Sequence, residues 1–170
     1  MQQSRRIGNA KMILYHGSNV VVRNPKLMPQ ARALDFGRAF YLTSDFEQAA
    51  KWARTSVLRR GDGVATVSSF ELDESRLAAL NVLRFAAPNA EWLRFVTRNR
   101  AEQIDDSEYD VVAGPVANDN TMPVLNLYFK GAYSEEEALK RLLPQRLSDQ
   151  YAMKTEGALE SLSFKEARSV

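Results

Sequence analysis

The sequence predicts an α+β fold, because strand-like and helix-like patterns alternate irregularly along the chain. A doubly wound parallel sheet would instead show a regular strand–helix–strand order. The composition is that of a folded protein, since 45% of the 170 residues are hydrophobic and 26% are charged. That length is typical of one domain, and no internal repeat or low-complexity linker divides it. We therefore expect one domain over residues 1–170, with residues 1–10 as a flexible N-terminal extension.

The first half is expected to hold two short strands, a helix and a longer strand. Apolar runs bounded by turn residues predict strands over 11–16 and 40–43, separated by a loop over 19–34. Ser44 and Glu47 have the spacing of a capping box, so the helix is expected to start with Ser44 as its N-cap and to end at Gly61. Its apolar positions repeat at helical spacing: Phe46, Ala49, Ala50, Ala53 and Val57. A strand over 64–72 should follow.

The second half predicts a similar mixture. Short apolar runs predict strands over 81–85, 109–113 and 150–154, and a helical turn over 157–159. Asn89 is the expected N-cap of a helix that runs to Glu102. A second capping box begins at Ser134, and its helix should run to Leu143, just before a proline.

Cysteine and histidine usage excludes several kinds of site. The chain has no cysteine, so disulfides, thiolate catalysis and cysteine-ligated metals are excluded. His16 is the only histidine, which also excludes metal sites built on two histidines, and no metal is expected. No stretch approaches the roughly 18 apolar residues of a membrane helix. No apolar segment follows the basic N-terminus as in a secretory signal, so a cytoplasmic protein without membrane contact is expected.

The charge balance does not identify a partner. The formal net charge is +2, so the molecule as a whole is not strongly attractive to nucleic acid. Two arginine clusters are either solvated helix faces or binding patches, and the first interpretation is favoured. They comprise Arg54, Arg59 and Arg60, and Arg94, Arg98 and Arg100.

Tyr41 and Trp52 are candidates for the two walls of a slot for a flat ring. Tyr41 lies on a predicted strand, and Trp52 lies eleven residues later on the helix that folds back beside it. An aromatic stacking contact adds roughly 0.5–1.5 kcal/mol beyond the burial of area. Each residue taken alone is better explained by packing in the core, because core aromatics far outnumber aromatic walls of ligand sites.

Four motifs in this order resemble the ADP-ribosyltransferase superfamily: ILYHGS over 13–18, DFGRAFYLT over 35–43, GPVAND over 114–119 and QYAMKTE over 150–156. The similarity is to the diphtheria-toxin and poly(ADP-ribose) polymerase branch, whose signature is His, Tyr and Glu on three strands. Within it, the chain resembles a bacterial family of stand-alone domains often found beside small antitoxin-like partners. The resemblance extends from residue 13 to about residue 164, and it implies a split antiparallel β-sheet core with flanking helices.

The resemblance also implies roles for individual residues. His16 would bind a ribose hydroxyl of NAD, the backbone of Gly17 would hold the nicotinamide carboxamide, and Ser18 would add a hydroxyl contact. Tyr41 and Trp52 would stack on the nicotinamide. Phe36, in the second motif, completes the expected cofactor-binding set, and the loop over 23–35 would cover the donor. The expected cofactor-binding residues are His16, Gly17, Ser18, Phe36, Tyr41 and Trp52.

The third motif departs from the family pattern, because Gln150 stands where the main branch has glutamate. A glutamine can hydrogen-bond a ribose hydroxyl, but it neither accepts a proton nor carries a negative charge. Asp149, Glu156 and Asp119 are carboxylates near motif positions. Asp119 is preferred because loops after strand ends often carry site residues. An Asx-turn role for it is equally consistent. The expected catalytic residues are His16, Tyr41, Gln150 and Asp119.

The resemblance implies an NAD-dependent mono-ADP-ribosyltransferase that uses NAD as a substrate. Its acceptor would be a macromolecule, either protein or nucleic acid, although small molecules stay open. A bacterial toxin of a toxin–antitoxin pair, with a small antitoxin as partner, fits this interpretation. Two alternatives remain open: a catalytically weak module that binds NAD or ADP-ribose, and an NAD glycohydrolase with water as acceptor. Gln150 favours the binding module.

Overall fold

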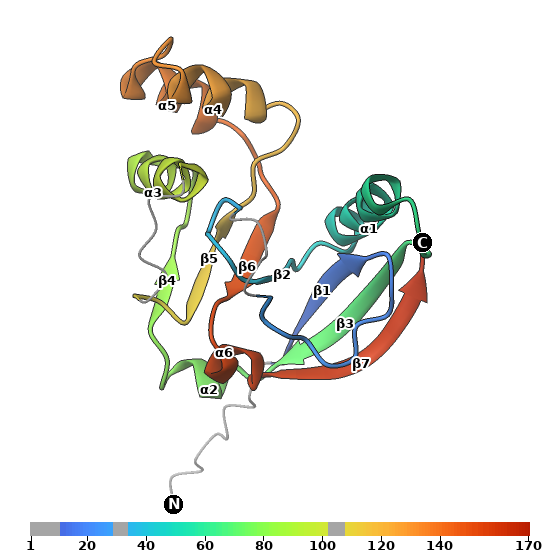
Figure 1. Cartoon of the computed structure of the whole chain (residues 1–170). Helices are drawn as coiled ribbons and strands as arrows, with labels where there is room; N and C mark the ends of the chain where they lie inside the picture. The colour runs from blue at the N-terminus through green and yellow to red at the C-terminus, as the bar shows by residue number, and fades with distance from the viewer. Residues whose placement is uncertain (1–10, 29–33, 102–107) are drawn as a thin grey trace, which may run out of the picture.

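A computed structural model describes residues 11–28, 34–101 and 108–170. The predicted flexible extension, residues 1–10, lies outside these described residues. The described chain has an α+β fold with two sheets and six helices (Figure 1).

The first sheet is antiparallel throughout and has the strand order β1-β3-β7. Its strands are β1 (Met12–Ser18), β3 (Thr66–Leu72) and β7 (Leu162–Ser169). The second sheet has the order β2-β6-β5-β4. Its strands are β2 (Phe40–Leu42), β6 (Asp149–Met153), β5 (Val111–Pro115) and β4 (Val82–Arg84). β4 and β5 pair in parallel, so the expectation of a wholly antiparallel core is wrong for this edge of the second sheet.

Helices cover the outer faces of the two sheets (Figure 1). α1 (Phe46–Arg60) packs on β1 and β3. α3 (Ala90–Arg100), α4 (Met122–Phe129) and α5 (Glu135–Leu142) gather against the second sheet. α3 lies in the connection between β4 and β5, which is the kind of crossover a parallel pair requires. Two short helices, α2 (Glu74–Leu77) and α6 (Glu156–Leu159), complete the set.

Alternation along the strands divides the core into two main layers. On β5, Val111 faces the cluster between the sheets, and its neighbour Val112 faces the cluster beneath the helices. On β1, Leu14 points between the sheets, while Tyr15 points at α1, where its ring meets Phe46 edge to face. The helical layer is centred on Trp92, which is fully buried. This alternation places His16 on the same face of β1 as Leu14, between the two sheets.

The two sheets are joined beside this face. The backbone N–H of Tyr15 donates to the oxygen of Thr43 at 2.8 Å, and the N–H of Thr43 donates to the oxygen of Tyr15 at 2.9 Å. This bridge holds the end of β2 beside β1. It brings the first and second motifs together, although 25 residues separate His16 from Tyr41.

The predicted elements are confirmed within a few residues, with one correction and three omissions. Asp45, and not Ser44, is the N-cap of α1, because its carboxylate accepts from the N–H groups of Glu47 and Gln48. The caps of α3 at Asn89 and of α5 at Ser134 are as predicted. Three elements, α2, α4 and β7, are not predicted from the sequence. α4 lacks a side-chain cap, and β7 is a largely polar strand, so neither carries a strong local signal.

No helix in the described part of the chain is both long and apolar enough to cross a bilayer.

Candidate functional site

A cavity of about 600 Å³ lies where β1, β2 and β6 meet one face of α1. Its lining includes residues from all four sequence motifs described above. The GPVAND motif contributes residues 116–117, which directly follow β5. The predicted site residues in its wall are His16, Gly17, Ser18, Tyr41, Trp52 and Gln150. The prediction that three separate strands bring His16, Tyr41 and Gln150 to one cleft is therefore confirmed.

The orientation of the His16 ring is set by the strand beside it. Its Nδ1 lies 2.7 Å from the backbone oxygen of Tyr41. Because a carbonyl oxygen can only accept, Nδ1 must carry the hydrogen of this bond. The His16 ring also stacks on the ring of Phe40, with the two ring centroids 4.2 Å apart. In the neutral ring, Nε2 is then a hydrogen-bond acceptor, and its partner can be a hydroxyl group of a ligand.

Burial lowers the pKa of His16 below its usual value of 6.5. The hydrogen bond to the Tyr41 carbonyl acts in the opposite direction but is the smaller of the two effects. The neutral form is therefore favoured at pH 7. A neutral histidine with a fixed tautomer suits a positioning role better than a proton donor's role.

Gly17 is required by the helix packed against it. A Cβ built at this position would collide with the backbone oxygen of Ala49 and would lie 2.8 Å from the backbone nitrogen of Ala53. Packing against α1 therefore requires glycine at position 17, whether or not a ligand also contacts its backbone. The next residue, Ser18, lines the cavity, and its Oγ donates to Asn19 at 3.4 Å.

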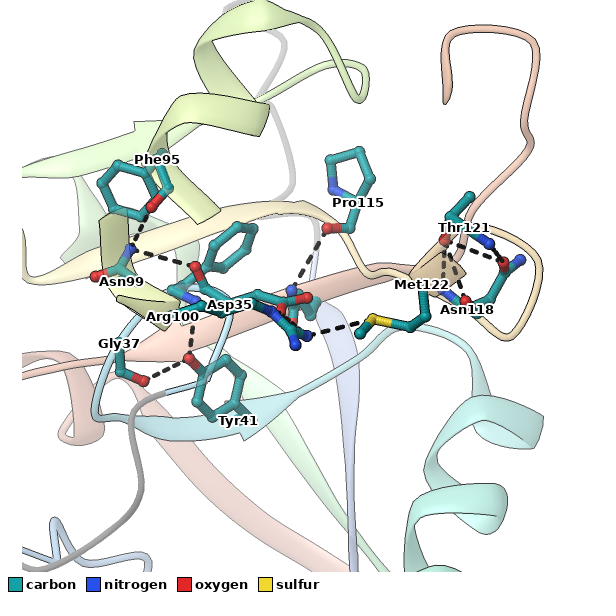
Figure 2. Close-up of polar contacts among 12 residues, drawn as sticks. Asp35, Gly37, Tyr41, Phe95, Asn99, Arg100, Pro115, Asn118, Thr121 and Met122 are labelled. Atoms are coloured by element: carbon teal, nitrogen blue, oxygen red, sulfur yellow. Dashed lines mark hydrogen bonds and ion pairs between the residues drawn. The ribbon is translucent and has the colours of Figure 1, made fainter. Parts of the chain in front are cut away.

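The aromatic walls come from different elements, as predicted. Tyr41 projects from β2, and Trp52 projects from α1. The Tyr41 hydroxyl donates to the oxygen of Gly37 at 2.6 Å and accepts from the N–H of Phe36 at 3.0 Å (Figure 2). These bonds fix the ring at the turn before β2. Trp52 is only partly buried, which fits a residue at the edge of a cavity.

Gln150 is almost completely buried, with 3% of its surface exposed. Its Nε2 lies 3.4 Å from the oxygen of Pro115, and only the nitrogen end of the amide can donate to a carbonyl. Among the described residues, no group donates to its Oε1. The preceding residue, Asp149, anchors this end of β6, because its carboxylate accepts from the N–H of Ser44 at 2.8 Å and from Thr43 Oγ1 at 3.1 Å.

Two predicted site residues lie elsewhere. Phe36 is fully buried in the helical core layer, and its ring contacts Phe85 and Phe95, so the prediction that it lines the ligand site is wrong. Asp119 has a side chain that is 89% exposed and pairs with Lys51 on the surface at 2.9 Å. Asp119 does not line the cavity, so its predicted catalytic role is not supported by its position.

The other two carboxylates considered in the sequence analysis are also accounted for. Asp149 is engaged in the anchor described above. Glu156 is an exposed residue at the start of α6 and does not line the cavity. In the GPVAND motif, Asn118 makes the Asx turn, since its Oδ1 accepts from the N–H groups of Asn120 and Thr121.

The charged part of the cavity wall is not predicted from the sequence. Lys26, Arg59, Arg60 and Arg100 line it, and Asp35 is the only acidic residue among the described lining residues. Arg59 and Arg60 belong to the first arginine cluster, for which a solvated helix face is the interpretation that the sequence favours, and both line the cavity. The second arginine cluster divides: Arg100 reaches the cavity, whereas Arg94 forms a paired contact with Glu135, 2.9 Å and 2.7 Å long.

The loop expected to cover a donor is described only in part. Residues of its described portion, including Asn24 and Lys26, line the cavity, and residues 29–33 lie outside the described residues. Within the ranges that the structure describes, no three histidine, aspartate or glutamate side chains gather as metal ligands would.

Residues 12–164 match the model of the DUF3990 family, whose description is a protein of unknown function. The match spans most of the chain, so the chain belongs to this family. No curated protein matches it.

Proposed function

We propose that this member of the DUF3990 family is an NAD-dependent mono-ADP-ribosyltransferase. It would break the bond between nicotinamide and ribose and transfer ADP-ribose to a macromolecular acceptor. The observation that carries the proposal is the convergence of His16, Tyr41, Trp52 and Gln150, from four separate elements, on one cavity.

The size of the cavity supports a ligand of this class. About 600 Å³ lies within the range of 300–1,000 Å³ that is usual for sites of small molecules and cofactors. Its walls combine three aromatic side chains, Phe40, Tyr41 and Trp52, with polar groups that converge from different elements. Nicotinamide is flat and would stack on the aromatic side chains, while the ribose hydroxyls would donate to His16 Nε2 and Gln150 Oε1.

The charges along α1 support a direction for the bound dinucleotide. Trp52, Ser56 and Arg59 lie at positions i, i+4 and i+7 of the helix and all line the cavity. At a rise of about 1.5 Å per residue, Arg59 lies roughly 10 Å along the axis from Trp52. A nicotinamide at Trp52 would thus place its ribose beside Ser56 and its diphosphate near Arg59 and Arg60. Arginine is well suited to phosphate groups, because its planar fork donates two hydrogen bonds in parallel.

The chemistry requires little more than this arrangement. When the bond between C1′ and the nicotinamide nitrogen breaks, its electron pair leaves with the ring, which becomes neutral. Positive charge then develops on the ribose, as in the oxocarbenium-like transition state of glycoside hydrolysis. No acid has to protonate the leaving group. The residues must hold the ring and ribose in place and stabilise the developing charge.

The test is to incubate the protein with NAD and measure free nicotinamide, first with water as the only acceptor and then with candidate proteins and nucleic acids. We expect release by the wild type and a loss of about tenfold or more in His16→Ala, since the donor is no longer held. Glu136→Gln is the control, because this side chain is 84% exposed on α5, outside the cavity. Release without labelling of any acceptor would assign NAD glycohydrolase activity instead.

A second candidate function is a module that binds NAD or ADP-ribose without chemistry, and Gln150 is the observation that favours it. Tight binding of both ligands by calorimetry, with no nicotinamide released by the wild type, would establish this function in place of the transferase.

A further inference from the structure

We propose that Asp35 supplies the negative charge that Gln150 lacks, and that its carboxylate touches the ribose of the bound donor. This inference rests on the proposed function and adds a catalytic residue to it. The assignment comes from the position and bonding of Asp35 in the cavity wall, together with the absence of any other acidic residue among the described lining residues.

The Asp35 carboxylate is buried but only half engaged by the protein. Its side chain is 7% exposed, and its Oδ1 accepts from Arg100 Nε at 2.7 Å and from a second nitrogen of the same guanidinium. None of the described residues donates to Oδ2. A buried carboxylate is costly unless it is paired and hydrogen-bonded, so an oxygen left without a donor in a cavity wall is placed to receive one from a ligand. A ribose hydroxyl is such a donor.

The turn that carries Asp35 is held from several sides. The backbone oxygen of Asp35 accepts from Asn99 Nδ2 at 3.2 Å. The next two residues are fixed by the Tyr41 hydroxyl, which accepts from the N–H of Phe36 and donates to the oxygen of Gly37 (Figure 2). Gly37 has a φ of 86°, a backbone conformation that other residues rarely adopt. The charge is therefore held in place before any substrate binds, which is the condition for electrostatic stabilisation of a transition state.

The same bonds connect Asp35 to the predicted nicotinamide end of the cavity. Tyr41 carries the stacking ring, its hydroxyl holds the Asp35 turn, and its backbone oxygen holds His16. The wall at this end thus combines the Tyr41 ring, the acceptor Nε2 of His16 and the Asp35 carboxylate, to whose Oδ2 none of the described residues donates. These are the groups that the nicotinamide and its ribose require.

The step that Asp35 would assist is a dissociation followed by capture. The bond between C1′ and the nicotinamide nitrogen breaks, and its electron pair stays on nicotinamide. The Asp35 carboxylate stabilises the positive charge on the ribose through Oδ2. The acceptor then forms a bond to C1′ and loses its proton to solvent. Arg100, paired with Oδ1, leaves Oδ2 as the oxygen that would face the ribose.

The alternative is that Asp35 and Arg100 form a purely structural pair that ties the turn to α3. A buried pair can be retained without contributing to function, and breaking it usually costs stability. The two roles differ in what they affect. A structural role lowers the melting temperature and disturbs NAD binding, whereas a catalytic role lowers turnover while binding is kept.

The experiment compares Asp35→Asn with the control Glu135→Gln. Asp35 pairs with Arg100 of α3, and Glu135 pairs with Arg94 of the same helix but lies outside the cavity. For each protein, nicotinamide release, the Kd for NAD and Tm are measured. We expect Asp35→Asn to lower release by about 100-fold or more with the Kd changed by less than roughly threefold. Release by the control should match the wild type. If Asp35→Asn is too unstable to assay, a double variant that combines Asp35→Asn with Arg100→Gln removes both charges of the pair. It should show the same loss of nicotinamide release.

Adding Gln150→Glu to Asp35→Asn tests the charge itself. If a negative charge beside the ribose is what is missing, the added glutamate should restore release by about tenfold or more. Normal release by Asp35→Asn from an active wild type would overturn the role of Asp35 and leave the proposed function standing. A loss explained by weakened NAD binding, without rescue, would also overturn it. No release by the wild type would overturn both.

Discussion

The imidazole of His16 and the backbone oxygen of Tyr41 are joined by a hydrogen bond of 2.7 Å between strands of two different sheets. This bond links the first and second sequence motifs and selects the tautomer that leaves Nε2 as an acceptor. Because burial also lowers the pKa of His16, the ring is favoured in its neutral form, in which it can receive a hydroxyl hydrogen.

The pH dependence of stability follows from this lowered pKa. A histidine whose pKa is lower in the folded state stabilises the fold fully above its unfolded value of 6.5. This contribution is lost as the pH falls from 6.5 toward the lowered pKa, because the unfolded chain then binds the proton more readily. We expect the stability difference between wild type and His16→Asn to shrink in that window. Chemical denaturation of both proteins at pH 8, 6.5 and 5 measures it, and a constant difference would contradict the prediction.

Protonation of His16 should weaken NAD binding at a lower pH than the titration of a free imidazole would predict. Burial lowers the pKa of His16, so the rise in Kd on acidification should have its midpoint below pH 6.5. Calorimetry across this range tests the prediction. A Kd that increases as the pH rises through 6.5 would show instead that the protonated ring binds the ligand.

Trp52→Ala should weaken NAD binding by about 1–3 kcal/mol, because it removes one stacking wall and leaves a void. The fold should persist, since Trp52 is only partly buried. Leu58→Ala on the same helix is the matched control, because that side chain is 84% exposed and does not line the cavity. An unchanged Kd in folded Trp52→Ala would mean that this residue only packs.

Gly17→Ala should lower Tm even without a ligand. The new Cβ would collide with the backbone of α1 at Ala49, and backbone atoms cannot move aside as a flexible side chain can. Gly157→Ala is the control, since its nearest neighbour would be a Leu80 methyl group at an ordinary 3.5 Å. Equal melting temperatures for wild type and Gly17→Ala would show that α1 can shift at little cost.

Arg59→Ala should weaken the binding of NAD and spare that of nicotinamide riboside, which has no diphosphate. The side chain lines the cavity two helical turns from Trp52, whereas Arg54 is exposed on the same helix and does not line it. Arg54→Ala is therefore the matched control for a lost positive charge. The loss for NAD should shrink at high salt, because ion pairs are screened. Equal losses for both ligands would contradict the predicted direction of the dinucleotide.

Local patterns in the sequence were sufficient for the elements and for part of the site. Apolar runs and caps such as Asn89 and Ser134 predicted helices and strands, because these signals act between residues close in the chain. The resemblance of short motifs was sufficient to select His16, Tyr41, Trp52 and Gln150, all of which line one cavity. β7 was missed because its partner, β3, lies about 90 residues earlier and the strand carries few apolar residues of its own.

The charged wall of the cavity depends on the tertiary structure. Asp119 follows a strand, as site residues often do, but its loop points to the surface, where it meets Lys51. Asp35 and Arg100 are 65 residues apart, and their contact depends on how α3 packs across the second sheet. A charge on an exposed helix face and a charge in a cavity wall have the same local sequence pattern. Only the packing of distant elements decides which of them is buried beside the site.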